Sequence, residues 1–304
     1  MSSIISTPDE LSSNRKKASG RCWRVVEAQN QISTTKLTDS SAEQRALELL
    51  IEETKPPVPA ECRHLNFLLS TPFRYGAAYP RGSRFRRAGF TPGVFYASER
   101  VETAIAELCF LRLLFFSESP DTKWPANAGE YTAFAAKYAT GRSVDLTLPP
   151  FDSRSAIWMH PTDYEPCQAL AAMAREADIE LIRCASVRDP KHHANLAILS
   201  CRAFAHSAPV AHQTWRVLLG GNGARAVCEL PRRKLDFNRD AFVADPRIAS
   251  MKWERSRRVA DRITAHSRAS GNPGAYANGW VPAFAGTSGL ESRIGFEAAP
   301  AAGP

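Results

Sequence analysis

The stretch from residue 82 to residue 116 constrains the fold most, because it sets a loop, a strand and a helix in immediate succession. Pro92-Gly93 predicts a turn, and the apolar run that follows places Tyr96 on a strand. Ser98 is a suitable N-cap for the next helix, which carries apolar residues at helical spacing. About two turns beyond this cap, Glu107 falls among apolar neighbours. The segment therefore predicts a carboxylate on a packed helix that directly follows a strand.

The rest of the chain predicts several short strands that are interrupted by helices. Helices are expected over residues 38–54, in a short segment that ends before Pro72, and from Asp163 onward. Strands are expected at 22–29, within 124–150, and at 179–183, 195–200, 214–219 and 224–230. These elements lack the regular alternation of a parallel doubly wound sheet, so the predicted fold class is α+β, in a single domain.

Composition along the chain predicts its organisation. The polar, Ser-rich residues 1–20 are expected to be a disordered lead-in, and residues 21–237 to form the folded domain with a helical insert at 39–70. Residues 238–264 are expected to be a C-terminal extension. Residues 265–304 are dominated by Gly, Pro, Ser and Ala and are expected to be a disordered tail.

Charge and cysteine usage exclude several classes of protein. The net charge is +8, but most of the excess lies after residue 230, so a dedicated nucleic-acid binder is not predicted. No apolar run is long enough for a membrane helix, and the N-terminus lacks the apolar core of a secretory leader. The seven cysteines are scattered and form no CxxC pair, which favours reduced thiols in a cytoplasmic protein.

The order of polar residues between 82 and 107 is one that nucleotide chemistry can use. Arg84, Arg86 and Arg87 offer forked donors for phosphates, Tyr96 offers a ring for stacking, and Glu107 can stabilise a developing cationic sugar. Each residue alone has a plainer interpretation, as a solvated basic patch, a core tyrosine and a boundary carboxylate. Their order along three consecutive elements favours a joint function.

Other polar motifs predict structure rather than chemistry. His192-His193 is expected to be a surface turn, because adjacent histidines point apart and lack further ligands at metal spacing. The glycines from Gly220 lack the Lys-Ser/Thr of a phosphate loop and predict a hairpin turn. Small core positions are expected for Cys109, Cys167, Cys201 and Cys228.

Three separated segments resemble the RES-domain family. They are WRVVEAQ (23–29), GSRFRRAGFTPGVFYASERVETAIAE (82–107) and IRCASVRDPKHHANLAIL (182–199). They are similar to the family's opening Arg, its Gly-x-Arg-aromatic…Gly-x-x-Tyr-x-Ser…Ala-x-x-Glu block and its Ser…Asn segment. The resemblance extends from Trp23 to Leu235, and the insert at 39–70 is typical of a longer subgroup.

The resemblance implies a fold similar to that of ADP-ribosyltransferases and a role as the toxin of a bacterial RES/Xre-type toxin–antitoxin pair. NAD would be the substrate, with no separate cofactor and no metal, and its nicotinamide–ribose bond would be split with phosphate or water as acceptor. ADP-ribose transfer to a protein is the first alternative, and a binding module without catalysis is the second. The implied protein partner is a helix-turn-helix antitoxin.

The resemblance also implies roles for individual residues. It assigns catalysis to Glu107, Tyr96 and Arg84, and NAD binding to Arg24, Arg86, Ser186 and Asn195. Phe85-Arg86 stands where the family commonly has Trp-Asn, so either Arg84 or Arg86 is the site arginine.

Overall fold

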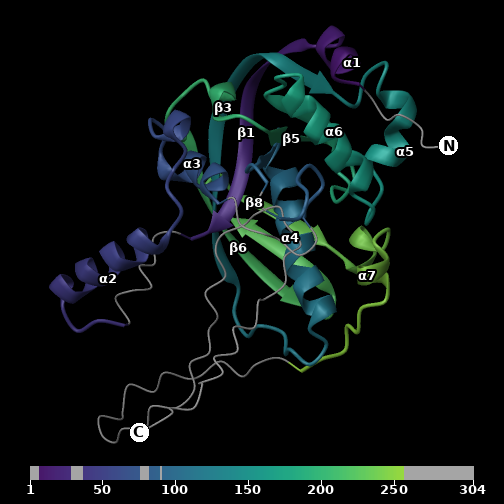
Figure 1. The fold of residues 1–304 in the computed structure, drawn as a ribbon. Coiled ribbons are helices and arrows are strands. Elements are labelled where there is room, and N and C mark those ends of the chain that lie inside the picture. The colour runs from purple at the N-terminus through teal and green to yellow at the C-terminus, as the bar shows by residue number, and fades with distance from the viewer. Residues whose placement is uncertain (1–6, 29–36, 76–81, 90, 257–304) are drawn as a thin grey trace, which may run out of the picture.

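The computed structural model describes residues 7–28, 37–75, 82–89 and 91–256, which form an α+β domain built on one mixed sheet (Figure 1). The predicted fold class is confirmed. The tail predicted for 265–304 and the first six residues of the predicted lead-in lie outside the described residues.

The described elements are as follows. The α-helices are α1 (Pro8–Ser13), α2 (Ser41–Thr54), α3 (Phe67–Arg74), α4 (Val101–Glu118), α5 (Ser155–Trp158), α6 (Glu165–Glu176) and α7 (Pro246–Ala249). The strands are β1 (Lys16–Glu27), β2 (Phe95–Ser98), β3 (Gly129–Asp145), β4 (Leu181–Ala185), β5 (Ala194–Ile198), β6 (Ala211–Gly220), β7 (Gly223–Cys228) and β8 (Arg233–Phe237). Short 3-10 helices are η2 (Ala60–Cys62), η3 (Asp152–Arg154), η4 (Cys201–Ala203) and η5 (Arg239–Phe242).

The sheet has the strand order β1-β2-β5-β4-β3-β6-β7-β8, and β1 also pairs along β3. This extra pairing closes β1, β2, β5, β4 and β3 into a ring, while β6, β7 and β8 continue from β3 as a meander. β1 and β2 touch at a single pair, Trp23 with Ser98. Side chains from β1, β2 and β5 therefore meet at one place in the ring.

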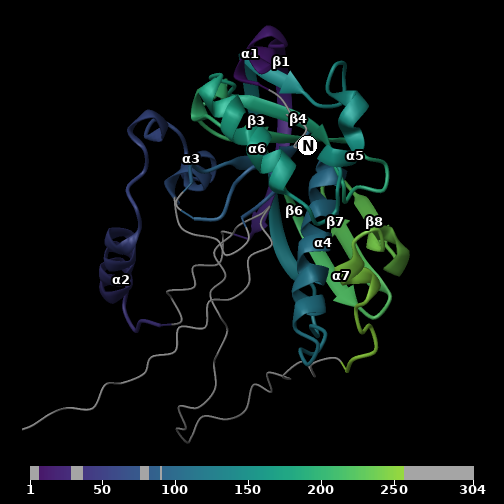
Figure 2. The same cartoon turned by 45° about the vertical axis from the view of Figure 1, so that its right-hand side comes forward.

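Helix α4 is buried because it is apolar on nearly every side. Eleven of its 18 residues are buried, including Ile105, Cys109 and Leu113. It follows β2 after only two residues and packs on β1, so its position is fixed against the strands (Figure 2). Such a helix holds its side chains at well-defined places.

Within the helical insert, α2 lies apart from the strands, whereas α3 packs on β2 (Figure 1). Helix α2 is capped by Ser40 and contributes no buried residue. Helix α3 differs from its prediction, because it continues through Pro72 to Arg74. The reason is packing. Pro72 is buried, and its carbonyl lies 2.0 Å from where a Cβ would stand on Gly93, so only glycine permits this approach.

The prediction that residues 1–20 form a disordered lead-in is wrong for its described part. Thr7 caps α1 by accepting a hydrogen bond from the Glu10 backbone N–H, and Pro8 occupies the first turn. Leu11 is fully buried in the core beneath α6. Residues 16–20 have mostly exposed side chains, but their backbone pairs with β3. Pairing of the backbone leaves no hydrophobic pattern in the sequence, which is why this half of β1 was not predicted.

We expect Leu11→Ala to lower the free energy of unfolding by about 2–5 kcal/mol, because it leaves a cavity in a closed core. Urea unfolding followed by circular dichroism measures the change. Ser13→Ala, on the exposed face of the same helix, is the control and should change stability by less than about 0.5 kcal/mol. Equal stability of Leu11→Ala and the wild type would contradict the packing of α1.

The C-terminal extension is part of the folded domain up to residue 256, so no structural break follows residue 237. Phe242, Ile248 and Trp253 are buried in the same core as α4. Strand β8, which was not predicted, leads into this segment and pairs with β7. Its residues are mostly exposed, so it carries no alternating pattern.

Several smaller predictions can be compared with the structure. The glycines after residue 219 form the β6–β7 hairpin turn, as expected. All seven cysteines are buried free thiols. No helix in the described ranges is long and apolar enough to cross a membrane.

Candidate functional site

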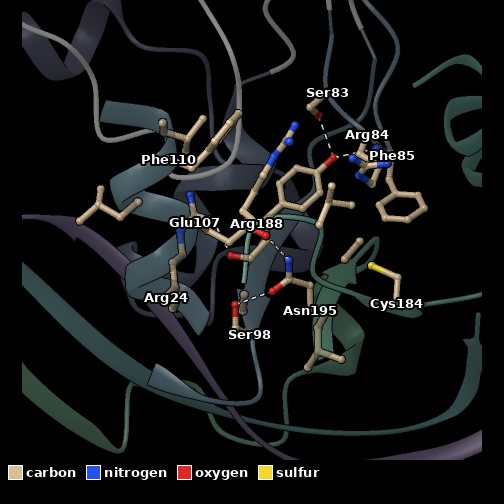
Figure 3. Close-up of a pocket in the computed structure, with 18 of the residues that line it drawn as sticks. Arg24, Ser83, Arg84, Phe85, Ser98, Glu107, Phe110, Cys184, Arg188 and Asn195 are labelled. Atoms are coloured by element: carbon tan, nitrogen blue, oxygen red, sulfur yellow. Dashed lines mark hydrogen bonds between the residues drawn. The ribbon is translucent and has the colours of Figure 1, made fainter. Parts of the chain in front are cut away.

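A cavity lies where β1, β2 and β5 meet the inner face of α4 (Figure 3). The loop before β2 and the loop after β4 complete its wall. Its polar side chains include Arg24, Ser83, Arg84, Tyr96, Ser98, Glu107, Tyr164, Arg188 and Asn195. Three arginines and one glutamate give the wall an excess of positive charge.

Glu107 lies halfway along α4 and is held by two side-chain donors. The Ser186 hydroxyl donates to Glu107 Oε1 at 2.7 Å, and the Asn195 amide donates to the same oxygen at 2.6 Å. In the described part of the chain no donor reaches Oε2, while Glu107 itself lines the cavity. The carboxylate is therefore oriented through Oε1, and Oε2 is available to a ligand.

A chain of hydrogen bonds continues beyond Asn195 (Figure 3). The Ser98 hydroxyl donates to Asn195 Oδ1 at 2.6 Å, which directs the amide N–H group at Glu107. The prediction that Ser98 caps α4 is wrong. The N-cap is Arg100, without a side-chain cap, because Ser98 is still paired in β2 and its hydroxyl is used by Asn195.

Ser186 is fully buried at the start of the loop after β4. Its hydroxyl oxygen accepts the backbone N–H groups of Arg188 at 3.2 Å and Asp189 at 2.9 Å, so its own proton is directed to Glu107. Asp189 fastens the loop to α4 by accepting a hydrogen bond from Thr103. The loop is thus held to α4 at two places, by Ser186 on Glu107 and by Asp189 on Thr103.

The two adjacent histidines belong to this loop. His193 Nδ1 lies 2.7 Å from Asp189 Oδ2, and His192 Nδ1 lies 2.8 Å from the Ser186 carbonyl oxygen. The described residues contain no group of three or more His, Cys, Asp or Glu side chains arranged to hold a metal.

Tyr96 is anchored through its hydroxyl group. The Phe85 backbone N–H donates to this oxygen at 3.0 Å, and Ser83 Oγ lies 2.7 Å from it. Burial raises the pKa of Tyr96 to about 12, even though these partners favour the ionised form, so the phenol stays neutral at physiological pH. The ring is a fixed part of the wall.

The structure separates Arg84 from Arg86. Ser83 and Arg86 exchange backbone hydrogen bonds of 2.7 and 3.0 Å in a tight turn, which directs the two arginines differently. Arg84 lines the cavity, stacks on Tyr164 and donates to the carbonyls of Trp158 and His160.

Arg86 is buried and is not among the residues that line the cavity. Its guanidinium donates to the side chain and carbonyl of Thr91 and to the Tyr75 carbonyl, so it holds the loop before β2. Of the two arginines left open by the sequence, only Arg84 lines the cavity.

Arg24 comes from β1, as the sequence indicated, and is almost fully buried. Its Nη1 donates to the Tyr96 carbonyl at 2.8 Å, and its guanidinium lies 5.0 Å from the centre of the Phe95 ring. This places a positive charge where β1 and β2 meet.

Two further wall residues were not assigned from the sequence. Arg188, two positions after Ser186, lies with its guanidinium 3.8 Å from the centre of the Phe110 ring. The sequence signal that could have identified Arg188 was its position between Ser186 and Asn195, in the segment that resembles the family. Cys184 also lines the cavity, but burial raises the pKa of its thiol to about 12, so it stays protonated and is a poor nucleophile.

We expect Asn195→Ala to lower the turnover of any reaction that needs an oriented Glu107 by about 10- to 100-fold, the effect of losing one hydrogen bond to a charged group. Ser98→Ala is the matched control, because it removes only the bond that steadies Asn195, and it should cost less than about 10-fold. Steady-state kinetics of both variants show which of the two loses more turnover. A larger loss in Ser98→Ala would contradict the role of Asn195.

Comparisons with known proteins give the following findings. The model of the RES domain family matches residues 58–219, more than half of the chain. No curated protein matches the chain. Among solved structures, it is similar to a chain of "Crystal structure of the M.tuberculosis MbcT-MbcA toxin-antitoxin complex", with a TM-score of 0.36 and 11% identity over 81% of this chain and 100% of that chain.

Proposed function

The chain belongs to the RES domain family, and from this premise we propose that it cleaves the nicotinamide–ribose bond of NAD, with phosphate or water as acceptor. The observation that carries the proposal is the Glu107 carboxylate, which is oriented by Ser186 and Asn195 in a cavity walled by three arginines. A fixed carboxylate in positive surroundings suits a substrate that is anionic overall and becomes cationic at one carbon.

The chemistry needs little more than this carboxylate. When the bond between nicotinamide N1 and ribose C1′ breaks, its electron pair moves to the pyridinium ring, which leaves as neutral nicotinamide. Positive charge then develops on C1′ and the ring oxygen of the ribose. Glu107 Oε2 stabilises this charge, and an acceptor oxygen attacks C1′ and loses its proton. The stabilisation is effective because Glu107 is already oriented before the substrate binds.

The remaining wall residues suit the rest of the substrate. Arg24 and Arg84 contribute positive charge for the pyrophosphate, and the fixed Tyr96 ring is a platform for the nicotinamide end. Both arginines use part of their guanidinium groups for backbone carbonyls, which holds them in place without a substrate. This preorganisation lowers the cost of binding.

The test is to incubate the purified protein with NAD, with and without inorganic phosphate, and to separate the nucleotides by chromatography. The expected result is loss of NAD and equimolar release of nicotinamide. The second product distinguishes the acceptors, since phosphate gives an ADP-ribose phosphate and water gives ADP-ribose. No loss of NAD under any acceptor condition would overturn the proposal.

The two alternatives predict different results in the same assay. Transfer to a protein would consume NAD only with a target protein present, and would leave ADP-ribose attached to it. A binding module without catalysis would bind NAD, or fail to bind it, but would not release nicotinamide. The orientation of Glu107 favours catalysis over the second alternative, because a binding module does not need an aligned carboxylate.

The proposed role in the cell is that of a toxin restrained by a helix-turn-helix antitoxin, as the family resemblance implies. Controlled expression in bacteria should stop growth together with a fall in cellular NAD. Co-expression of its helix-turn-helix antitoxin should restore both. Growth arrest without a fall in NAD would contradict the link between the site and toxicity.

A further inference from the structure

Asp245 is a fully buried carboxylate in the C-terminal extension, beyond the residues that the family model matches. It caps α7 by accepting the Arg247 backbone N–H at 3.0 Å. Its Oδ2 lies 2.7 Å from Arg247 Nη2 and 3.0 Å from Arg188 Nη2. Burial works against its charge, but the Arg247 and Arg188 guanidiniums outweigh burial and hold the pKa of Asp245 below its usual value.

Arg188 is the partner of Asp245 that reaches the cavity. Its Nη2 also donates to the Pro161 carbonyl at 2.5 Å and to the Tyr164 hydroxyl at 3.3 Å, and its guanidinium stacks on Phe110. Within the described ranges, every polar contact of this guanidinium is made by Nη2. Nη1 and Nε therefore keep their donors while the group lines the same cavity as Glu107 (Figure 3).

We infer that Arg188 binds the pyrophosphate of the substrate, and that Asp245 is the positioning residue that aims it into the cavity. The inference rests on the proposed function for the identity of the substrate. Arg188 is then a third cation for the pyrophosphate, beside Arg24 and Arg84. The C-terminal extension contributes to the site through Asp245.

The contacts of Arg188 with Asp245 and Phe110 support this inference. A buried guanidinium needs a compensating charge, and Asp245 supplies it through Nη2, without using Nη1 or Nε. The Phe110 ring fixes the plane of the guanidinium, so the directions of Nη1 and Nε are fixed as well. Nη1 and Nε do not share an edge of the guanidinium, so each can donate to a different oxygen of a pyrophosphate, which a lysine at the same place would contact only as a point charge.

The experiment compares four variants by steady-state kinetics with NAD and by thermal unfolding. Arg188→Met keeps the apolar stem on Phe110 and should raise KM for NAD by about 10- to 100-fold, with a smaller effect on kcat. Asp245→Asn preserves the helix cap, and should raise KM by about 10-fold and lower Tm, because the buried Arg188 then lacks a counter-charge. Arg188→Met/Asp245→Asn should recover Tm but keep the raised KM.

Arg247→Gln is the control, since Arg247 shares Asp245 without lining the cavity, and its KM should stay within about twofold.

Titration calorimetry with inorganic pyrophosphate separates this inference from the proposed function. Weaker pyrophosphate binding by Arg188→Met and Asp245→Asn than by the wild type supports the inference, even if the wild type does not consume NAD. If the wild type consumes NAD while Arg188→Met keeps its KM and its pyrophosphate affinity, the inference is overturned and the proposed function stands. A KM that recovers together with Tm in the double variant would also overturn it, because the effect would then be structural.

Discussion

Glu107→Gln is expected to lower NAD turnover by about 1000-fold while leaving the fold intact. The amide side chain has the same shape, and its oxygen can still accept from Ser186 and Asn195, so the network survives. What is lost is the negative charge beside the developing cation, and removal of one such electrostatic group costs about 100- to 1000-fold. Nicotinamide release measures the loss, and circular dichroism checks the fold.

The matched control is Glu102→Gln, on the same helix. Glu102 pairs with Arg233 at the exposed surface and does not line the cavity. Loss of a surface ion pair changes stability by less than about 1 kcal/mol, and turnover should stay at the wild-type level. If Glu107→Gln were as active as Glu102→Gln, the assignment of the carboxylate would be wrong.

The largest expected effect on stability is that of Trp124→Ala, at about 3–5 kcal/mol in the free energy of unfolding. Trp124 is buried against Phe116, with ring centres 4.7 Å apart, and its indole N–H donates to the Trp253 carbonyl at 3.1 Å. The substitution opens a large cavity and releases the C-terminal extension from α4. Chemical unfolding measures the change in free energy. It is followed by far-UV circular dichroism and not by tryptophan fluorescence, because the substitution removes a tryptophan.

Val243→Ala is the control for that substitution. Val243 belongs to the same extension but is about half exposed, at 47%. Its truncation should change stability by less than about 0.5 kcal/mol. Limited proteolysis adds a second readout, since Trp124→Ala should expose the segment after residue 238 to cleavage and Val243→Ala should not. Equal stability of the two variants would contradict the packing of the extension on α4.

Local patterns in the sequence were sufficient for the elements that carry most of the site. Tyr96 lies on a strand and Glu107 on the following helix, because β-prone and helical apolar patterns meet there without a long loop. The hairpin after residue 219 follows from its glycines. The association of Ser186 and Asn195 with Glu107 came from the family resemblance, and the structure brings the three side chains into contact.

Where the sequence prediction was wrong, contacts between distant segments decided the structure. Residues 16–20 join the sheet through backbone bonds, which any side chain allows, and α1 forms because Leu11 meets a core built from residues far along the chain. Helix α3 tolerates Pro72 because Gly93, 21 positions later, leaves room for it. None of these contacts leaves a periodic signal.

The sequence by itself determined the fold class, the strand–helix succession from β2 to α4 and the carboxylate on α4, since these depend on residue types at short spacing. Only the tertiary structure decided that Arg84 and not Arg86 lines the cavity, because a tight turn sends adjacent side chains in different directions. It also brought Asp245 to Arg188 across 57 positions. A buried ion pair of this kind depends on where two segments meet in space, and spacing along the chain carries no record of it.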